Sequence, residues 1–187
     1  MKKQFPLLHK TVLFSAAVIL FSLSACKKDN NIKTDTTING IVSTTPDFST
    51  LNAAVMKAGL SATLSGAGPF TVFAPNNAAF TASGITTAVL GSLTAAQAKN
   101  ILLYHTIGAK IMAAQVPAGP NAPVLAANGD TLYVTNKASG VYVNGIKVTQ
   151  ADVAASNGII HVIGNVLMPP SGNIVQMAQA DTSLSYL

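Results

Sequence analysis

Apolar residues recur with a helical period in the first half of the chain. Phe48, Leu51 and Val55 are separated by three and four residues, so one face of a helix would carry all three. Thr45 is a residue type that often caps a helix start, and Gly59 is one that often ends a helix. The pattern predicts a helix between Thr45 and Gly59.

A second helix has a stronger start signal. Thr94 and Gln97 match a capping box, in which each side chain bonds a free backbone N–H of the first turn. We expect this helix to end at Gly108, and a shorter helical turn to precede it at 86–90. The residues that would share one stripe of the longer helix are Ala98, Ile101, Leu102 and His105.

The second half of the chain has the pattern of an antiparallel sheet. Asn144-Gly145 separates two β-rich runs and is a strong hairpin signal, because both turn residues need a positive φ. By contrast, residues 115–123 contain three prolines and predict an irregular loop. Helices first and strands later favour one α+β domain. The predicted strands are 70–74, 131–135, 141–143, 146–148 and 159–163.

The beginning of the chain is typical of a secretory signal over residues 1–25. A basic start precedes an uncharged apolar stretch of about 15 residues, which is shorter than the roughly 20 needed to span a bilayer. Leu23-Ser24-Ala25-Cys26 resembles a lipobox, and Cys26 is the only cysteine, so we expect Cys26 to be lipidated. An ordinary secretory signal is the alternative. The polar residues 26–39 predict a flexible tether, or else an arm packed on the domain.

Composition excludes several classes of function. The chain has 11 Lys and Arg residues against six Asp and Glu, but all the basic residues are lysines and three of them lie in the signal. No basic patch with arginines is visible, so we expect no nucleic-acid partner. Without a single Glu, with no nucleophile elbow, and with few His, the sequence predicts neither an enzyme nor a metal or cofactor site.

Three segments, in order, resemble the signature of fasciclin (FAS1) domains. They are the run 71–80 (TVFAPNNAAF), the pair Tyr104-His105, and the run 143–170 with its Asn-Gly turns and closing Pro-Pro. The resemblance implies a FAS1-type wedge-shaped β-sandwich with helices packed around it, over residues 40–170, followed by a tail over 171–187. The matching structural residues are Thr71, Phe73, Pro75, Phe80, Asn144, Gly145, Asn157, Gly158 and His161.

The resemblance also suggests where partners would bind. In animal members the Tyr-His region and the segment around an Asp-Ile pair have been proposed to touch integrins. The candidate partner-binding residues here are therefore Tyr104, His105, Asp152 and Val153. A bacterium has no integrins, so only the idea of a binding surface carries over.

Each candidate also has a structural interpretation. His105 lies in the last turn of its helix, where the dipole favours a protonated ring and a half-buried His can bond to backbone. His161 shares a strand face with Ile159 and Ile163, so it is either a satisfied core histidine or a base or metal ligand. Asp152 is either the cap of a local turn or a partner contact.

Together these features predict a lipid-anchored, extracytoplasmic module at the outer membrane, on its cell-surface or periplasmic face. It would bind a protein or polysaccharide of cells or matrix. The alternatives are an accessory glycan-binding lipoprotein and a periplasmic structural module. No cofactor is expected.

Overall fold

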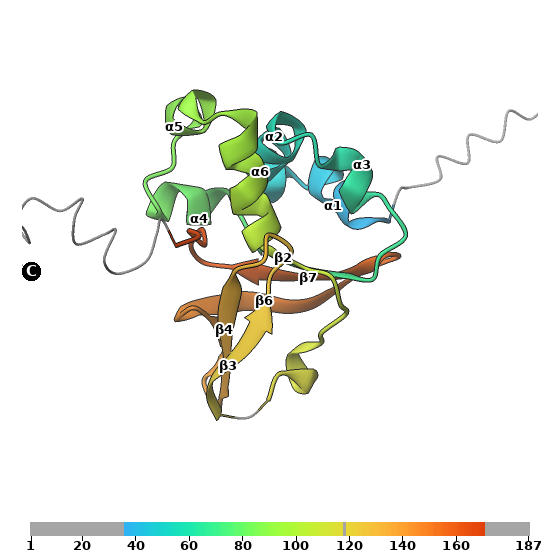
Figure 1. Ribbon diagram of the computed structural model, residues 1–187, viewed down its shortest axis with the longest axis vertical. Helices are drawn as coiled ribbons and strands as arrows, with labels where there is room; N and C mark the ends of the chain where they lie inside the picture. The colour runs from blue at the N-terminus through green and yellow to red at the C-terminus, as the bar shows by residue number, and fades with distance from the viewer. Residues whose placement is uncertain (1–35, 118, 171–187) are drawn as a thin grey trace, which may run out of the picture. The chain divides into compact units, whose positions relative to one another are not determined.

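The computed structural model describes residues 36–117 and 119–170 (Figure 1). The predicted signal, Cys26, most of the predicted tether and the tail at 171–187 lie outside the described residues. Within the described part, no helix combines the length and apolarity needed to cross a membrane.

The first half of the domain is mainly helical. Thr94 and Gln97 form the predicted capping box, and Phe48, Leu51 and Val55 are all buried. The helix predicted after Thr45 is a short 3-10 turn followed by an α-helix. The helical elements are α1 (Ile38–Thr44), η1 (Pro46–Phe48), α2 (Ser49–Lys57), α3 (Ser61–Leu64), α4 (Asn77–Ala82), α5 (Thr87–Ser92), α6 (Ala95–Tyr104) and η2 (Ala113–Gln115).

The strands form one curled mixed sheet of seven strands in the order β2-β1-β7-β6-β5-β4-β3. Strands β1 and β7 pair in parallel, and every other pair is antiparallel. The α+β class is confirmed. The strands are β1 (Phe70–Pro75), β2 (Thr106–Ile107), β3 (Gly119–Leu125), β4 (Thr131–Lys137), β5 (Gly140–Val143), β6 (Ile146–Ala155) and β7 (Gly158–Ile163).

The neighbouring strands β1 and β7 face two cores, because successive side chains of a strand point to opposite faces. Val72 of β1 and Ile160 of β7 face a first core that is filled by α1, α2, α4 and α6. Phe73 of β1 and Ile163 of β7 face a second core, which β4 and β5 complete. Figure 1 shows the helices gathered over one face of β7, with β3 and β4 on the other side of it. Both faces of β7 are therefore buried, as expected for a strand whose residues are apolar on both faces apart from His161.

The hairpin predicted at Asn144-Gly145 is confirmed. Asn144 has φ 46° and Gly145 has φ 79°, and these two residues join β5 to β6. A turn with two positive φ values matches the twist of the flanking strands.

Three predicted boundaries were wrong. The irregular loop expected at 115–123 gives way to strand β3 at Gly119, because an edge strand tolerates prolines that a central strand would exclude. The predicted tether 26–39 overlaps α1, in which Ile38 is fully buried. The helix expected to reach Gly108 ends at Tyr104, where His105 caps it and β2 begins immediately afterwards.

Candidate functional site

Tyr104 and Asn144 join the end of α6 to the β5–β6 turn. The Asn144 Nδ2 group donates to the Tyr104 hydroxyl at 2.8 Å, and that hydroxyl donates to the Thr131 carbonyl at 3.3 Å. The Asn144 Oδ1 atom accepts from the Tyr133 N–H at 2.8 Å. The Tyr104 ring is only 3% exposed, so Tyr104 mainly fixes the neighbouring strands and presents little surface of its own.

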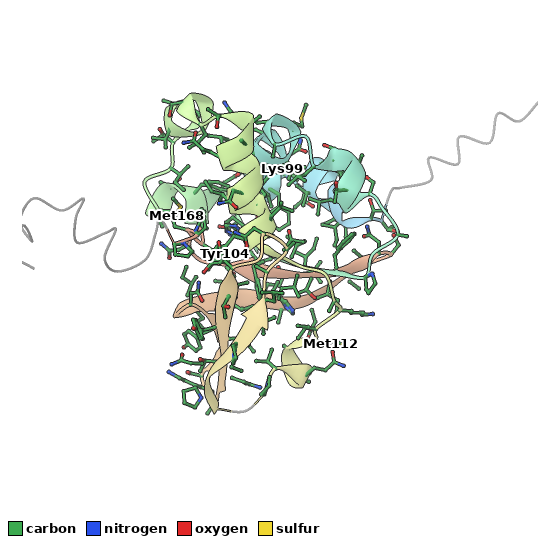
Figure 2. The ribbon with its side chains drawn as sticks, viewed as in Figure 1. Lys99, Tyr104, Met112 and Met168 are labelled. Carbon is green, nitrogen blue, oxygen red and sulfur yellow. The ribbon has the colours of Figure 1, made fainter. Side chains whose placement is uncertain are left out.

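These residues surround a surface hollow of about 490 Å³, which we call the Tyr133 hollow. Tyr133 is 49% exposed and Met168 is 62% exposed, so both carry apolar surface at the hollow. Large exposed apolar side chains beside polar groups are typical of contact surfaces. Figure 2 labels Tyr104 and Met168. The lining residues are Tyr104, Asn121, Thr131, Tyr133, Asn144, Gly145, Met168 and Pro170.

His105 is buried and serves the fold. Its Nδ1 lies 2.8 Å from the Ile101 carbonyl, and its Nε2 lies 2.9 Å from the Leu167 N–H. Because a carbonyl only accepts and an N–H only donates, the ring is held as the neutral Nδ1–H tautomer. Burial lowers the pKa of His105 from 6.5 to about 4, and the bond to Ile101 opposes this only in part. The expected bond to backbone is confirmed, but the expectation of a half-buried, protonated ring was wrong, because the ring is fully buried and burial disfavours its charged form.

His161 and Asp152 lie together on the opposite side of the sheet from the helices. The Asp152 N–H donates to Nδ1 of His161 at 3.2 Å, and Nε2 of His161 lies 2.9 Å from the Ile111 carbonyl. The ring stacks on Phe73 with 5.6 Å between centroids. His161 is 4% exposed, and its two ring nitrogens are both used, which matches the interpretation as a satisfied core histidine.

Asp152 does not cap a local turn, as one interpretation expected. It has φ 57° within β6, beside an irregularity in the pairing of β6 with β7. Its Oδ1 accepts from the Ala113 N–H at 2.9 Å, so it holds the distant turn η2. Because Asp152 and Ala113 are 39 residues apart in sequence, the residues around Asp152 give no indication of this hydrogen bond.

The other signature residues support the strands. The Thr71 hydroxyl donates to the Ala109 carbonyl at 2.6 Å and accepts from the Ile111 N–H at 2.9 Å. Asn157 bonds the Ile38 N–H and two carbonyls, those of Leu64 and Gly66. At Gly158, a Cβ would collide with the Phe70 carbonyl, so only glycine allows β1 and β7 to approach this closely. Pro75 ends β1, and Phe80 is buried in the first core.

The four candidate partner-binding residues do not form one site. Tyr104 lines the Tyr133 hollow, whereas His105 is buried and does not line it. Val153 is half-buried against the first core and lines a different hollow with Gln150, while Asp152 is exposed beside η2.

Sequence reasoning missed Tyr133 and Met168. The signal for Tyr133 was available, because Leu132 and Val134 on either side of it are buried and alternation then places Tyr133 outward. Met168 had no such signal, since it follows the last strand in an irregular segment.

The ring nitrogens of the two histidines in the described residues are engaged by the fold. Both His105 and His161 bond only to backbone groups. Within residues 36–117 and 119–170, no three side chains of His, Cys, Asp or Glu gather in a way that could hold a metal ion.

The Fasciclin domain family matches residues 46–169, and the chain belongs to this family. Over 125 residues it is 46% identical to Protein sll1483 of a Synechocystis strain, a match that covers 66% of this chain and 68% of that protein. Over 128 residues it is 44% identical to the pig transforming growth factor-beta-induced protein ig-h3. That match covers 66% of this chain but only 18% of ig-h3, so this chain corresponds to a small part of ig-h3.

A solved structure shares the fold. It is the FAS1 domain pair from the insect cell adhesion molecule fasciclin I, with a TM-score of 0.54 and 24% identity, covering 72% of this chain and 49% of that one. The predicted FAS1-type fold is therefore confirmed.

Proposed function

We propose that this protein is a non-catalytic adhesion module, anchored through a lipid on Cys26, that binds partners on cells or matrix through the Tyr133 hollow. The observation that carries the proposal is which side chains are buried in the fold and which are exposed. Every histidine of the described residues is buried and bonded to backbone, whereas Tyr133 and Met168 leave apolar surface open to solvent.

The family supports adhesion as the role. The fasciclin I structure is that of a cell adhesion molecule, and it has the same fold. The Tyr133 hollow suits non-covalent recognition, since its aromatic ring provides contact area and the neighbouring Asn and Thr groups provide hydrogen bonds. Lipid attachment at Cys26 would hold such a surface at the membrane where partners are met.

Polysaccharide binding is the second candidate, and Tyr133 favours it. A half-exposed ring beside the Asn121 side chain offers a face for a sugar ring and an amide for its hydroxyls. A glycan array separates the two candidates. If the protein binds a specific glycan and Tyr133→Ala abolishes that binding, the partner is a polysaccharide. If no glycan on the array is bound, a protein partner is favoured.

Surface exposure on intact cells tests the proposed location. Cells producing the full-length protein are treated with protease beside a periplasmic control protein, and a Cys26→Ser variant is treated in parallel. We expect the wild-type domain to be cleaved while the control survives, and Cys26→Ser to be lost from the membrane fraction. Protection of the wild-type domain until the outer membrane is opened would overturn surface adhesion and favour a periplasmic structural module.

A further inference from the structure

A mainly apolar cavity, partly open to solvent, lies within the second core, separate from the Tyr133 hollow. Its volume is about 220 Å³, and it lies between β1 and β2 on one side and β3, β4 and β5 on the other. Its apolar walls are formed by Phe73, Ile107, Val116, Val124, Val134 and Val141. An engineered protein cavity of about 150 Å³ with similar walls stays dry and binds benzene. This space is large enough for a small apolar molecule.

Residues 109–117 cover this cavity, and we call them the cover segment. Thr71 bonds both Ala109 and Ile111, and His161 bonds the Ile111 carbonyl. Further along, the Asn136 side chain donates to the Val116 carbonyl at 3.3 Å. These bonds fix the cover segment from two sides of the cavity, so the cavity is a defined space rather than a gap under a loose loop.

The polar groups on the cavity wall are already satisfied. The Thr71 hydroxyl and both nitrogens of His161 have partners, and no buried side-chain N or O atom of the described residues lacks one. Nothing in the wall therefore requires an ordered water, and an apolar guest would displace little bound solvent.

Lys110 gives the cavity its single charge. It lines the cavity, is exposed, and lies between Ala109 and Ile111, the two residues that Thr71 holds. The Lys110 ammonium makes no hydrogen bond or ion pair with the described residues. An apolar space with an unpaired cation among its lining residues is complementary to an amphipathic anion.

We propose that this cavity binds small apolar carboxylic acids, with the apolar body between the two halves of the sheet and the carboxylate at Lys110. A cavity of about 150 Å³ holds the six carbon atoms of benzene, so by proportion this cavity has room for an apolar group of roughly nine non-hydrogen atoms. This binding activity is separate from adhesion through the Tyr133 hollow, since the two spaces share no lining residue.

NMR titration of the purified full-length protein tests the proposal. The probes are 3-phenylpropionate and its neutral analogue 3-phenylpropanol. We expect both to shift the methyl signals of Val116, Val134 and Val141, with the carboxylate binding more tightly at low salt. Lys110→Gln should weaken binding of the carboxylate about twofold to fivefold and leave binding of the alcohol unchanged, as for an exposed ion pair. The matched control Lys99→Gln, on an exposed position of α6, should change neither.

Filling the cavity gives an independent test. Val124→Phe and Val141→Phe replace two half-buried wall residues, and each should abolish binding of both probes. A thermal melt shows which of these variants is folded. Lys110→Gln, at an exposed position, tests the proposal even if neither filled variant folds. The proposal is overturned if neither probe binds the wild type, if binding survives in a folded filled variant, or if Lys110→Gln leaves the affinity for the carboxylate unchanged.

Discussion

The Leu167 N–H donates to Nε2 of His105 at 2.9 Å, across 62 residues of sequence. This bond ties the segment after β7 to the end of α6. It exists only while Nε2 carries no proton, and burial holds the pKa of His105 at about 4. His105 therefore connects the end of helix α6 to the segment that follows β7.

The bond between His105 and Leu167 predicts that the stability of the fold decreases in acid. The pKa is about 4 in the folded state against 6.5 as the ordinary value, so the unfolded chain binds the proton more readily. The stabilisation from the neutral ring is complete above pH 6.5 and is lost as the pH falls to about 4. At about 1.4 kcal/mol per pH unit, the loss amounts to about 3 kcal/mol. Urea unfolding at pH 7.0 and pH 4.5 measures it.

A His105→Gln variant isolates this effect from the titration of carboxylates. It should be less stable than the wild type at pH 7.0, but the difference between the two proteins should shrink by about 2 to 3 kcal/mol at pH 4.5. If both proteins lose the same stability between the two pH values, His105 is not the source of the acid sensitivity.

Local signals were enough to predict several elements. The capping box at Thr94 and Gln97 and the turn at Asn144-Gly145 depend on residues next to each other in sequence, and both are present. The strand predicted at 70–74 is likewise confirmed as β1. Other local signals were missed: the Asn76 side chain caps α4 by accepting from the Ala79 N–H at 2.8 Å, and that helix was not predicted.

Features that depend on distant partners could not be predicted this way. Strand β3 contains Pro120 and Pro123 and forms only because it lies at the edge of the sheet. The parallel pairing of β1 with β7 joins the two ends of the domain. The sequence leaves Asp152 as either a local turn cap or a partner contact, and neither interpretation includes its bond to the Ala113 N–H. The Tyr133 hollow combines residues of β3, β4, the β5–β6 turn and the segment after β7, so it exists only after folding.

The buried side-chain amide of Asn157 should contribute strongly to stability. Its Oδ1 accepts from the Ile38 N–H, and its Nδ2 donates to the Leu64 and Gly66 carbonyls at 2.9 and 2.7 Å. Asn157→Ala removes all three bonds and leaves buried backbone groups unpaired, so we expect a loss of about 3 kcal/mol. Denaturant unfolding checks this, with the exposed Asn100→Ala as a control that should change stability by less than about 0.5 kcal/mol. Equal stability of the two variants would contradict the role of Asn157.

Gly145 should be required for its backbone conformation alone. Its φ is 79°, and a Cβ placed there would meet no atom within 4 Å. Gly145→Val should therefore destabilise the hairpin by about 1 to 2 kcal/mol through backbone strain. Gly91, within α5, also has open space around it but no positive φ, so Gly91→Ala should stabilise by about 0.5 to 1 kcal/mol. Thermal melts of the two variants and the wild type measure these changes. A melting temperature unchanged by Gly145→Val would show that the turn does not need glycine.

The central claim is that the domain binds its partner through the Tyr133 hollow. The most direct measurement is attachment of beads coated with the purified protein to the producing cells and to their extracellular matrix. Wild-type beads should attach, and Tyr133→Ala and Met168→Ser beads should attach at least tenfold less, as expected when a central contact is lost. Met56→Ser, which alters an equally exposed methionine on α2 outside the hollow, should attach like the wild type. Attachment that is unchanged by the two hollow variants, or absent in the wild type, would contradict the account.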